Sequence, residues 1–197
     1  SYIAGNLHGS NISYNDQGIT IVKTDYFAGE KHGKTVFYSE DGELQLARYY
    51  TYGTMTGYSY LGKDGKEINV IPVENETAKI VAYFDNGKVS REMNIVKGSF
   101  EDEYLKYYYS GQLRERQLYK NDEREGEVIG YFPSGKVEYH RMYSGGELNG
   151  VSKEFHANGK LKEEVTYLND TRTGEGKEYD MTGKLIKVTT YFDGQVV

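Results

Sequence analysis

The chain has 197 residues, of which 37% are hydrophobic and 24 are glycine, and it contains no cysteine and no tryptophan. Ordinary globular domains are about 45–50% apolar, so the composition argues against a thick core, and the missing thiols exclude disulfides and thiolate metal sites. The 24 basic and 30 acidic residues leave a net charge of −6, which argues against nucleic acid as a partner, and no apolar run is long enough for a membrane-spanning helix.

Glycine recurs with a nearly constant period from one end of the chain to the other. Successive members of one series are 22 to 24 residues apart, and a second glycine precedes most of them by nine residues. Self-similarity of this kind is the signature of a repeat protein. The sequence therefore predicts eight tandem units of about 24 residues, beginning at Gly9. The series comprises Gly18, Gly42, Gly65, Gly87, Gly111, Gly135, Gly159 and Gly183.

Two columns of mainly aromatic residues keep the same phase as the glycines. One lies four residues before each glycine of the series and the other lies eight residues after it. We expect the second column to form a tyrosine ladder in which the ring of each unit covers its neighbour. The first column holds Tyr14, Tyr38, Leu61, Tyr83, Tyr107, Tyr131, Phe155 and Tyr179, and the second holds Tyr26, Tyr50, Val73, Ile95, Tyr119, Tyr143, Tyr167 and Tyr191.

Each unit is predicted to be a β-hairpin. At Phe132–Gly135, proline stands where φ near −65° is favoured and glycine stands where φ turns positive, which is typical of a short hairpin loop with a glycine bulge. Strands are expected over residues 127–132 and 136–143, and frequent glycines exclude long helices. The predicted fold is an all-β, elongated, twisted antiparallel sheet of tandem hairpins, about 75 Å long.

We expect one continuous repeat domain with two irregularities. Residues 1–8 are expected to be the end of a truncated preceding repeat, because Tyr2–Gly5 matches Tyr26–Gly29. Residues 9–77 are expected to hold repeats 1–3 and residues 78–197 repeats 4–8, with a bend at 66–78, where Pro72 removes a ladder donor. The chain does not begin with methionine, so we expect an excised fragment or a processed chain. The compartment stays open between the cytoplasm and a secreted or cell-surface location.

No constellation of residues predicts catalysis, a cofactor or a metal site. The sequence has no P-loop, nucleophile elbow or dinucleotide fingerprint. The acidic runs 101–103 and 122–125 lack the spacing of a calcium loop, and we expect them to be solvated loop ends. Equivalent histidines one unit apart would be separated by about 10 Å, too far to share a metal. We expect exposed positions for all four histidines, which are His8, His32, His140 and His156.

One pattern recurs along the chain: a glycine, an aromatic residue, a polar-Gly-Lys-Leu segment and Tyr-x-x-Gly. This pattern resembles the bacterial variant of the MORN repeat (membrane occupation and recognition nexus). The best copy is residues 150–167, GVSKEFHANGKLKEEVTY, and residues 174–191 are the next best. The resemblance implies an elongated antiparallel sheet used for protein association or membrane proximity. Similar bacterial proteins are often labelled antitoxin components, and others are secreted or surface proteins of host-associated species. The eukaryotic motif carries a Tyr-x-Gly-x-Trp core, which this tryptophan-free chain lacks.

The leading hypothesis is a non-enzymatic repeat scaffold that binds a protein partner through an extended, tyrosine-rich sheet surface. A lipid-kinase label, which the resemblance to MORN-containing plant kinases would attach, is rejected because the chain is wholly repeat. The alternatives are a membrane- or lipid-associated or cell-surface interaction module, an antitoxin-type binder of a toxin, and a hidden polysaccharide-acting enzyme. Pairing between exposed terminal strands of two copies is also expected to be accessible.

Two sets of residues are assigned roles in this hypothesis. The candidate partner contacts are Tyr107, Tyr108, Tyr109 and Tyr131, the densest aromatic site with its counterpart in the next unit. The residues expected to maintain the repeat are Gly42, Gly87, Gly111, Gly135, Gly159, Gly183, Tyr119, Tyr143, Tyr167 and Tyr191.

Overall fold

The computed structural model describes residues 2–3, 5–39 and 42–197, and this part of the chain is all-β, with no helix. The prediction of tandem antiparallel hairpins is confirmed. Ala4, in the predicted match between Tyr2–Gly5 and Tyr26–Gly29, lies outside the described residues. The search for a helix long and apolar enough to cross a membrane finds none among the residues described. The chain divides into two compact units, which we call unit 1 (residues 1–98) and unit 2 (residues 99–197).

Unit 1 contains a six-stranded sheet in the order β3-β4-β5-β6-β7-β8, together with the hairpin β9–β10, which belongs to a different sheet. The hydrogen-bonded ladder of the first sheet thus ends at β8, which contains Pro72, inside the irregular segment 66–78. The strands are β1 (Tyr2–Ile3), β2 (Asn6–Leu7), β3 (Gly9–Tyr14), β4 (Thr20–Phe27), β5 (Glu30–Tyr38), β6 (Leu44–Thr51), β7 (Thr54–Ser59), β8 (Ile71–Pro72), β9 (Ala78–Tyr83) and β10 (Val89–Val96). The fully buried side chains of this unit include Leu46, Met55, Ile80, Met93 and Ile95.

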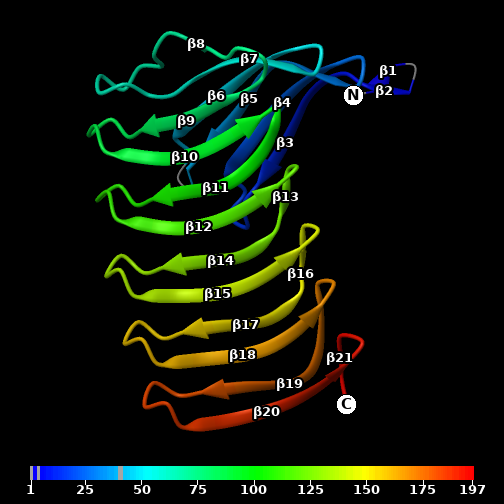
Figure 1. The fold of residues 1–197 in the computed structure, drawn as a ribbon, viewed down its shortest axis with the longest axis vertical. Coiled ribbons are helices and arrows are strands. Elements are labelled where there is room, and N and C mark those ends of the chain that lie inside the picture. Colours follow the sequence, from blue (N-terminus) through cyan, green and yellow to red (C-terminus); the bar gives the residue numbers. More distant parts are fainter. Residues whose placement is uncertain (1, 4, 40–41) are drawn as a thin grey trace. The chain divides into compact units, whose positions relative to one another are not determined.

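Unit 2 is a regular stack of hairpins in which each strand lies beside the next one along the chain (Figure 1). The short strands β13 and β16 pair with β12 and β15 where the chain passes from one hairpin to the next. The strands are β11 (Ser99–Tyr107), β12 (Leu113–Lys120), β13 (Glu123–Arg124), β14 (Gly126–Tyr131), β15 (Val137–Ser144), β16 (Glu147–Leu148), β17 (Gly150–Phe155), β18 (Leu161–Leu168), β19 (Thr171–Tyr179), β20 (Leu185–Phe192) and β21 (Gln195–Val196).

The loop inside each hairpin has the predicted glycine bulge. In the loop 132–135, the Gly135 N–H donates to the Phe132 carbonyl (2.8 Å), and the Phe132 N–H donates to the Lys136 carbonyl (2.8 Å). Gly135 has φ +81°, and all eight glycines of the series lie between +71° and +91°, a region that other L-residues rarely occupy. The glycine period of the sequence is therefore the period of the hairpin loops.

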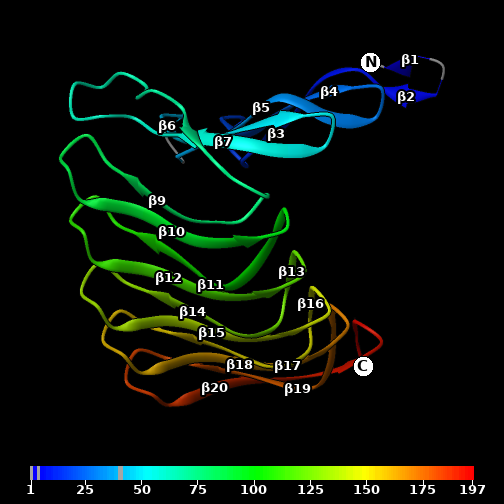
Figure 2. The same ribbon diagram turned by 45° about the horizontal axis from the view of Figure 1, so that its top comes forward.

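The link between successive hairpins is a two-residue turn in which both residues have positive φ, as in a type I′ turn. The values are +58° and +83° at Gly145 and Gly146. The Gly146 N–H donates to the Arg124 carbonyl of the preceding link (3.1 Å), and the same bond recurs from Asp170 to Leu148 (3.0 Å). In unit 2 the link turns thus lie at the side opposite the hairpin loops (Figure 2) and are hydrogen-bonded from one repeat to the next.

The acidic run 122–125 begins in one of these link turns, and the run 101–103 lies in β11, where Glu101 reaches the same turn. The Asp122 carboxylate accepts a hydrogen bond from the Phe100 N–H (2.8 Å), and Glu101 accepts one from the Asn121 N–H (3.1 Å). Glu125 accepts one from the Gly145 N–H (2.9 Å). These carboxylates satisfy backbone donors that the tight turns leave without a ladder partner, a role beyond the solvated loop ends that the sequence predicts.

The strand register gives the unit 2 sheet two chemically different faces. The ladder face carries Tyr143 and, in cross-strand register, Val128 opposite Arg141. The stripe face carries Tyr131 opposite Val137 and Ile129 opposite His140. The buried side chains of this unit lie on the ladder face, and they are Tyr104, Gln117, Val128, Ser152 and Val165.

Candidate interaction surface

The tyrosine ladder of unit 2 alternates with a second column of side chains. The Arg172 guanidinium lies between two successive tyrosines of the ladder, which we call rungs. Its Nε donates to the Tyr167 hydroxyl (3.1 Å), and its Nη1 donates to the Tyr191 hydroxyl (3.2 Å). Its carbon lies 6.0 and 5.4 Å from the two ring centroids. The hydrogen bond to Tyr167, followed by the one to Tyr191, raises the pKa of Arg172 against the opposing effect of burial.

The same position of the repeat fills the other gaps in the ladder. Phe100 packs 5.4 Å from the Tyr119 ring, and the Arg124 guanidinium lies 5.1 Å from the Tyr143 ring. Leu148 occupies this position in the next repeat. Successive rungs are two strands apart, about 10 Å, whereas aromatic pairs need centroids about 4.5–7 Å apart. The expectation that each tyrosine covers the next one is therefore corrected, because every rung is separated from its neighbour by an inserted side chain.

A buried polar cluster lies on the ladder face. The Glu115 side chain is 15% exposed and pairs with Lys106 (2.7 Å), and it accepts hydrogen bonds from Tyr139 and Gln117. Burial raises the pKa of Glu115, but Lys106 and these hydrogen bonds outweigh it, so the net pKa is lowered. Burial first, and then the bond to Glu115, raises the pKa of Tyr139. The cluster is internally satisfied and holds neighbouring hairpins together.

A second polar cluster lies in unit 1, around Glu67 of the irregular segment. Its carboxylate accepts hydrogen bonds from Ser59 (2.5 Å) and Tyr49 (2.6 Å) and pairs with Lys34 (2.9 Å). Burial raises the pKa of Glu67, but the combined effect of these three partners is larger and opposite, so the net pKa is lowered. Because Ser59 is fully buried and donates to the carboxylate, the cluster attaches the segment 66–77 to the sheet and presents no accessible nucleophile.

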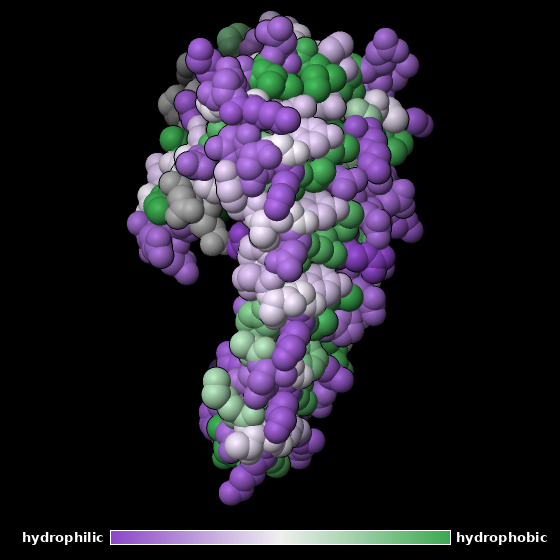
Figure 3. Space-filling model, turned by 90° about the vertical axis from the view of Figure 1, so that its left-hand side faces the viewer, coloured by the Kyte–Doolittle hydropathy of each residue, from purple (hydrophilic) through white to green (hydrophobic). Residues whose placement is uncertain are grey.

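The stripe face carries a row of apolar side chains, one from each long strand, which are half-buried except for the exposed Leu185. In each hairpin the last residue of the first strand faces the first residue of the second, as Phe155 faces Leu161. The row, which we call the stripe, consists of Tyr107, Leu113, Tyr131, Val137, Phe155, Leu161, Tyr179 and Leu185. In the lower part of Figure 3, green apolar atoms recur at intervals between purple polar atoms.

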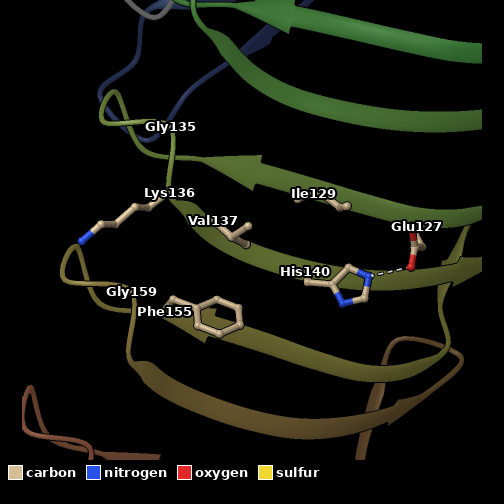
Figure 4. Close-up of a pocket in the computed structure, with 8 residues that line it drawn as sticks. All are labelled: Glu127, Ile129, Gly135, Lys136, Val137, His140, Phe155 and Gly159. Carbon is tan, nitrogen blue, oxygen red and sulfur yellow. Dashed lines mark hydrogen bonds and ion pairs between the residues drawn. The ribbon is translucent and has the colours of Figure 1, made fainter.

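A shallow pocket of about 650 Å³ opens on the stripe between two hairpins. Its apolar part is formed by Ile129, Val137 and Phe155, with the loop residues Gly135, Lys136 and Gly159 at one end (Figure 4). At the other end, Glu127 is hydrogen-bonded to His140 Nε2 (3.2 Å). The pocket thus combines an apolar floor with an exposed carboxylate.

The structure brings three of the four predicted contact tyrosines together. Tyr107 and Tyr131 belong to the stripe, and the Tyr108 hydroxyl donates to the Tyr131 carbonyl (2.6 Å), so it ties two hairpins together. Tyr109, in the loop beyond them, is 57% exposed. Sequence reasoning did not single out Phe155 and Val137 as contacts, although Phe155 occupies the first of the columns that it identified.

The expectation that the four histidines are exposed is wrong, since all four are half-buried. His32 packs 4.6 Å from the Tyr52 ring, His8 packs 4.9 Å from the Phe27 ring, and His156 is hydrogen-bonded to the Tyr179 carbonyl (2.9 Å). These three rings lie against the neighbouring repeat, and His140 is hydrogen-bonded to Glu127 of its own hairpin (3.2 Å). Within the described part of the chain, no group of three or more histidine, aspartate or glutamate residues is placed to hold a metal ion.

Comparison with known families gives one match. Residues 103–121, 124–144 and 148–169 match the model of the MORN repeat variant in three consecutive copies, all within unit 2. No curated protein matches the chain.

Proposed function

This chain is a MORN-variant repeat protein, and we propose that it is a non-catalytic scaffold that binds a protein partner along the stripe of unit 2. MORN repeats are generally non-catalytic modules, and the three matched copies span most of the stripe. The partner would contact several hairpins at once, so that affinity comes from repetition of a modest apolar contact.

The observation that carries the proposal is the difference between the two faces. On the ladder face, the gaps between tyrosine rungs are filled by side chains of the chain itself, such as Arg172. A hollow beside Tyr139 on this face is lined by the ion pair of Arg141 and Glu154 (3.3 Å). On the stripe face, the pocket between Val137 and Phe155 instead has an apolar floor. Aromatic and aliphatic side chains left half-exposed in a row are typical of the core of a protein interface.

The test is affinity capture from lysate of the source cells with three baits. These are the wild-type chain, Phe155→Thr in the stripe, and Phe192→Thr as a matched control. Phe192 is 74% exposed and lies at the end of β20, away from the pocket, and threonine keeps a strand-forming residue at both sites. A protein retained by the wild type and by the control but lost with Phe155→Thr is the expected result. Retention of the same proteins by all three baits would contradict the proposal.

A parallel sedimentation assay with vesicles containing anionic lipid separates this function from membrane association. The net charge of −6 opposes attraction to an anionic surface, so we expect the chain to stay in the supernatant at low salt. Salt-sensitive co-sedimentation that is unaffected by Phe155→Thr would favour membrane association.

A further inference from the structure

The stripe has a spacing that specifies the shape of its partner. Adjacent strands are about 4.8 Å apart, and the stripe alternates a large ring with a smaller aliphatic side chain, as in Tyr131, Val137, Phe155 and Leu161. The surface is therefore corrugated, with a ring every second strand, or about every 10 Å. The pocket at Val137 lies beside one of these rings, Phe155, with Ile129 as its other large apolar side chain.

A polyproline II helix has a matching repeat. It rises about 3.1 Å per residue with three residues per turn, so that every third side chain lies on one side at intervals of about 9.3 Å. An extended β-strand presents its side chains to one face about every 6.7 Å, which does not match the troughs. Aromatic-lined grooves are also the sites that other proteins use to bind proline-rich segments, because the pre-formed helix loses little entropy.

The negative charge of Glu127 beside the pocket favours a positively charged residue at the facing position of the partner. Stripe-face glutamates occupy the same repeat position on the first strands of three of the four hairpins, and Val151 occupies it in the other. Two of the glutamates have cationic partners: Glu103 pairs with Arg116 (2.8 Å) and Glu175 with Lys177 (3.4 Å). At the pocket the corresponding partner of Glu127 is His140, which, unlike arginine or lysine, is not permanently charged at neutral pH. The Glu127 side chain is 47% exposed, so a cation of the partner can reach it.

We infer that the stripe of unit 2 binds a proline-rich peptide in the polyproline II conformation, with an apolar residue at every third position and an arginine against Glu127. Each trough takes one proline or aliphatic side chain. The four hairpins of the stripe span three repeat pitches, about 30 Å, which about ten residues of polyproline II cover. This inference rests on the proposed function, since it names the class of partner.

The test uses fluorescence anisotropy with the full chain and labelled peptides of about ten residues, the length that spans the stripe. The first peptide is proline-rich with leucine at every third position and one arginine. The second has the same composition, but its leucines are moved next to each other, so that they no longer lie on one side of the helix. We expect the first peptide to bind and the second to bind about tenfold more weakly or not at all.

Two variants of the chain, with a third as control, test where the peptide binds. Phe155→Thr is expected to abolish binding of the first peptide, whereas Phe192→Thr leaves binding unchanged. Glu127→Gln is expected to weaken binding of the arginine peptide but not of a peptide with glutamine in place of arginine. Since Glu127 is exposed at the surface, this variant keeps the test decisive if Phe155→Thr fails to fold by circular dichroism.

Equal binding of the two peptides, or full binding by Phe155→Thr, would overturn the inference. So would no binding of the first peptide at millimolar concentration. If lysate capture still recovers a partner that depends on Phe155, the scaffold function stands and only the class of partner is wrong. If both assays are negative, the stripe is not a binding surface and both proposals fail.

Discussion

Replacement of Gly130 by alanine should destabilise unit 2 through one identifiable contact. Gly130 lies opposite Tyr139 in the β14–β15 register, and a Cβ atom added there would overlap the Tyr139 ring. The backbone at Gly130 is not in the positive-φ region, so backbone strain does not contribute. The ring has to move, and its hydroxyl then loses the hydrogen bond to the buried Glu115 carboxylate.

The expected size follows from these two effects. Forced overpacking costs about 1–3 kcal/mol, and a lost hydrogen bond to a charged group costs about 1.5–3 kcal/mol. Replacement of a strand glycine by alanine returns about 0.5–1 kcal/mol. Gly130→Ala should therefore destabilise the hairpin by about 2–5 kcal/mol. In a Tyr139→Thr background the ring is absent, and the same substitution should stabilise by about 0.5–1 kcal/mol.

Native-state hydrogen exchange of the amides in β14 and β15 measures both values locally. A local measurement is preferable because repeat arrays need not unfold in a single transition. Tyr139→Phe, which keeps the ring and removes the hydroxyl, isolates the hydrogen bond. If Gly130→Ala lowers the opening free energy equally with and without the Tyr139 ring, the overlap is not the cause and the reasoning fails.

Three further predictions concern the links between repeats. Glu67→Gln should weaken the attachment of segment 66–77 by about 1 kcal/mol. Because the pKa of Glu67 is lowered below its usual 4.5, the wild-type contribution is present above that value and lost as pH falls through the lowered pKa, so limited proteolysis against pH should show an acid-induced loss that the variant lacks. Arg172→Ala should destabilise β20 by about 1–2 kcal/mol in hydrogen exchange, whereas Arg172→Leu, which copies Leu148, should cost less than half of that. Lys97→Asn, at φ +50° before Gly98, creates the favoured Asn-Gly turn. It should raise the free energy of unfolding of unit 1 by about 0.5–1 kcal/mol, measured as a higher urea midpoint.

The fold could be predicted from the sequence because the positions that define it have few alternatives. A hairpin loop whose last residue must adopt positive φ strongly favours glycine, so the loops are recorded in the sequence as a glycine series. The link turns are harder to recognise in the sequence, because several residue types are tolerated at their positive-φ positions, such as Asn121 and Asp122. The stacking of the links was therefore not predicted, although it connects the repeats through backbone hydrogen bonds.

The candidate surface was predicted only in part, because aromatic residues that are adjacent in the sequence do not necessarily lie together on the surface. Tyr107, Tyr108 and Tyr109 are adjacent in the chain, but strand alternation and the loop direct them to a stripe, a tether and an exposed loop. The pocket instead joins residues of two hairpins, such as Val137 and Phe155. Finding it required the cross-strand register, which the repeat period does not supply.

The separation of about 10 Å between equivalent residues explains how the two faces of the sheet differ. An aromatic column alone cannot fill that interval, so each column needs a second set of side chains between its members. On the ladder face the second residue after each link turn provides it, because the turn places that residue beside the tyrosines of the ladder. These residues are Phe100, Arg124, Leu148 and Arg172. On the stripe face the intervening positions hold smaller side chains that pair with the rings across the strands, namely Leu113, Val137, Leu161 and Leu185. A hairpin repeat with one ring per unit therefore leaves regularly spaced troughs, unless a second large side chain in each repeat fills them.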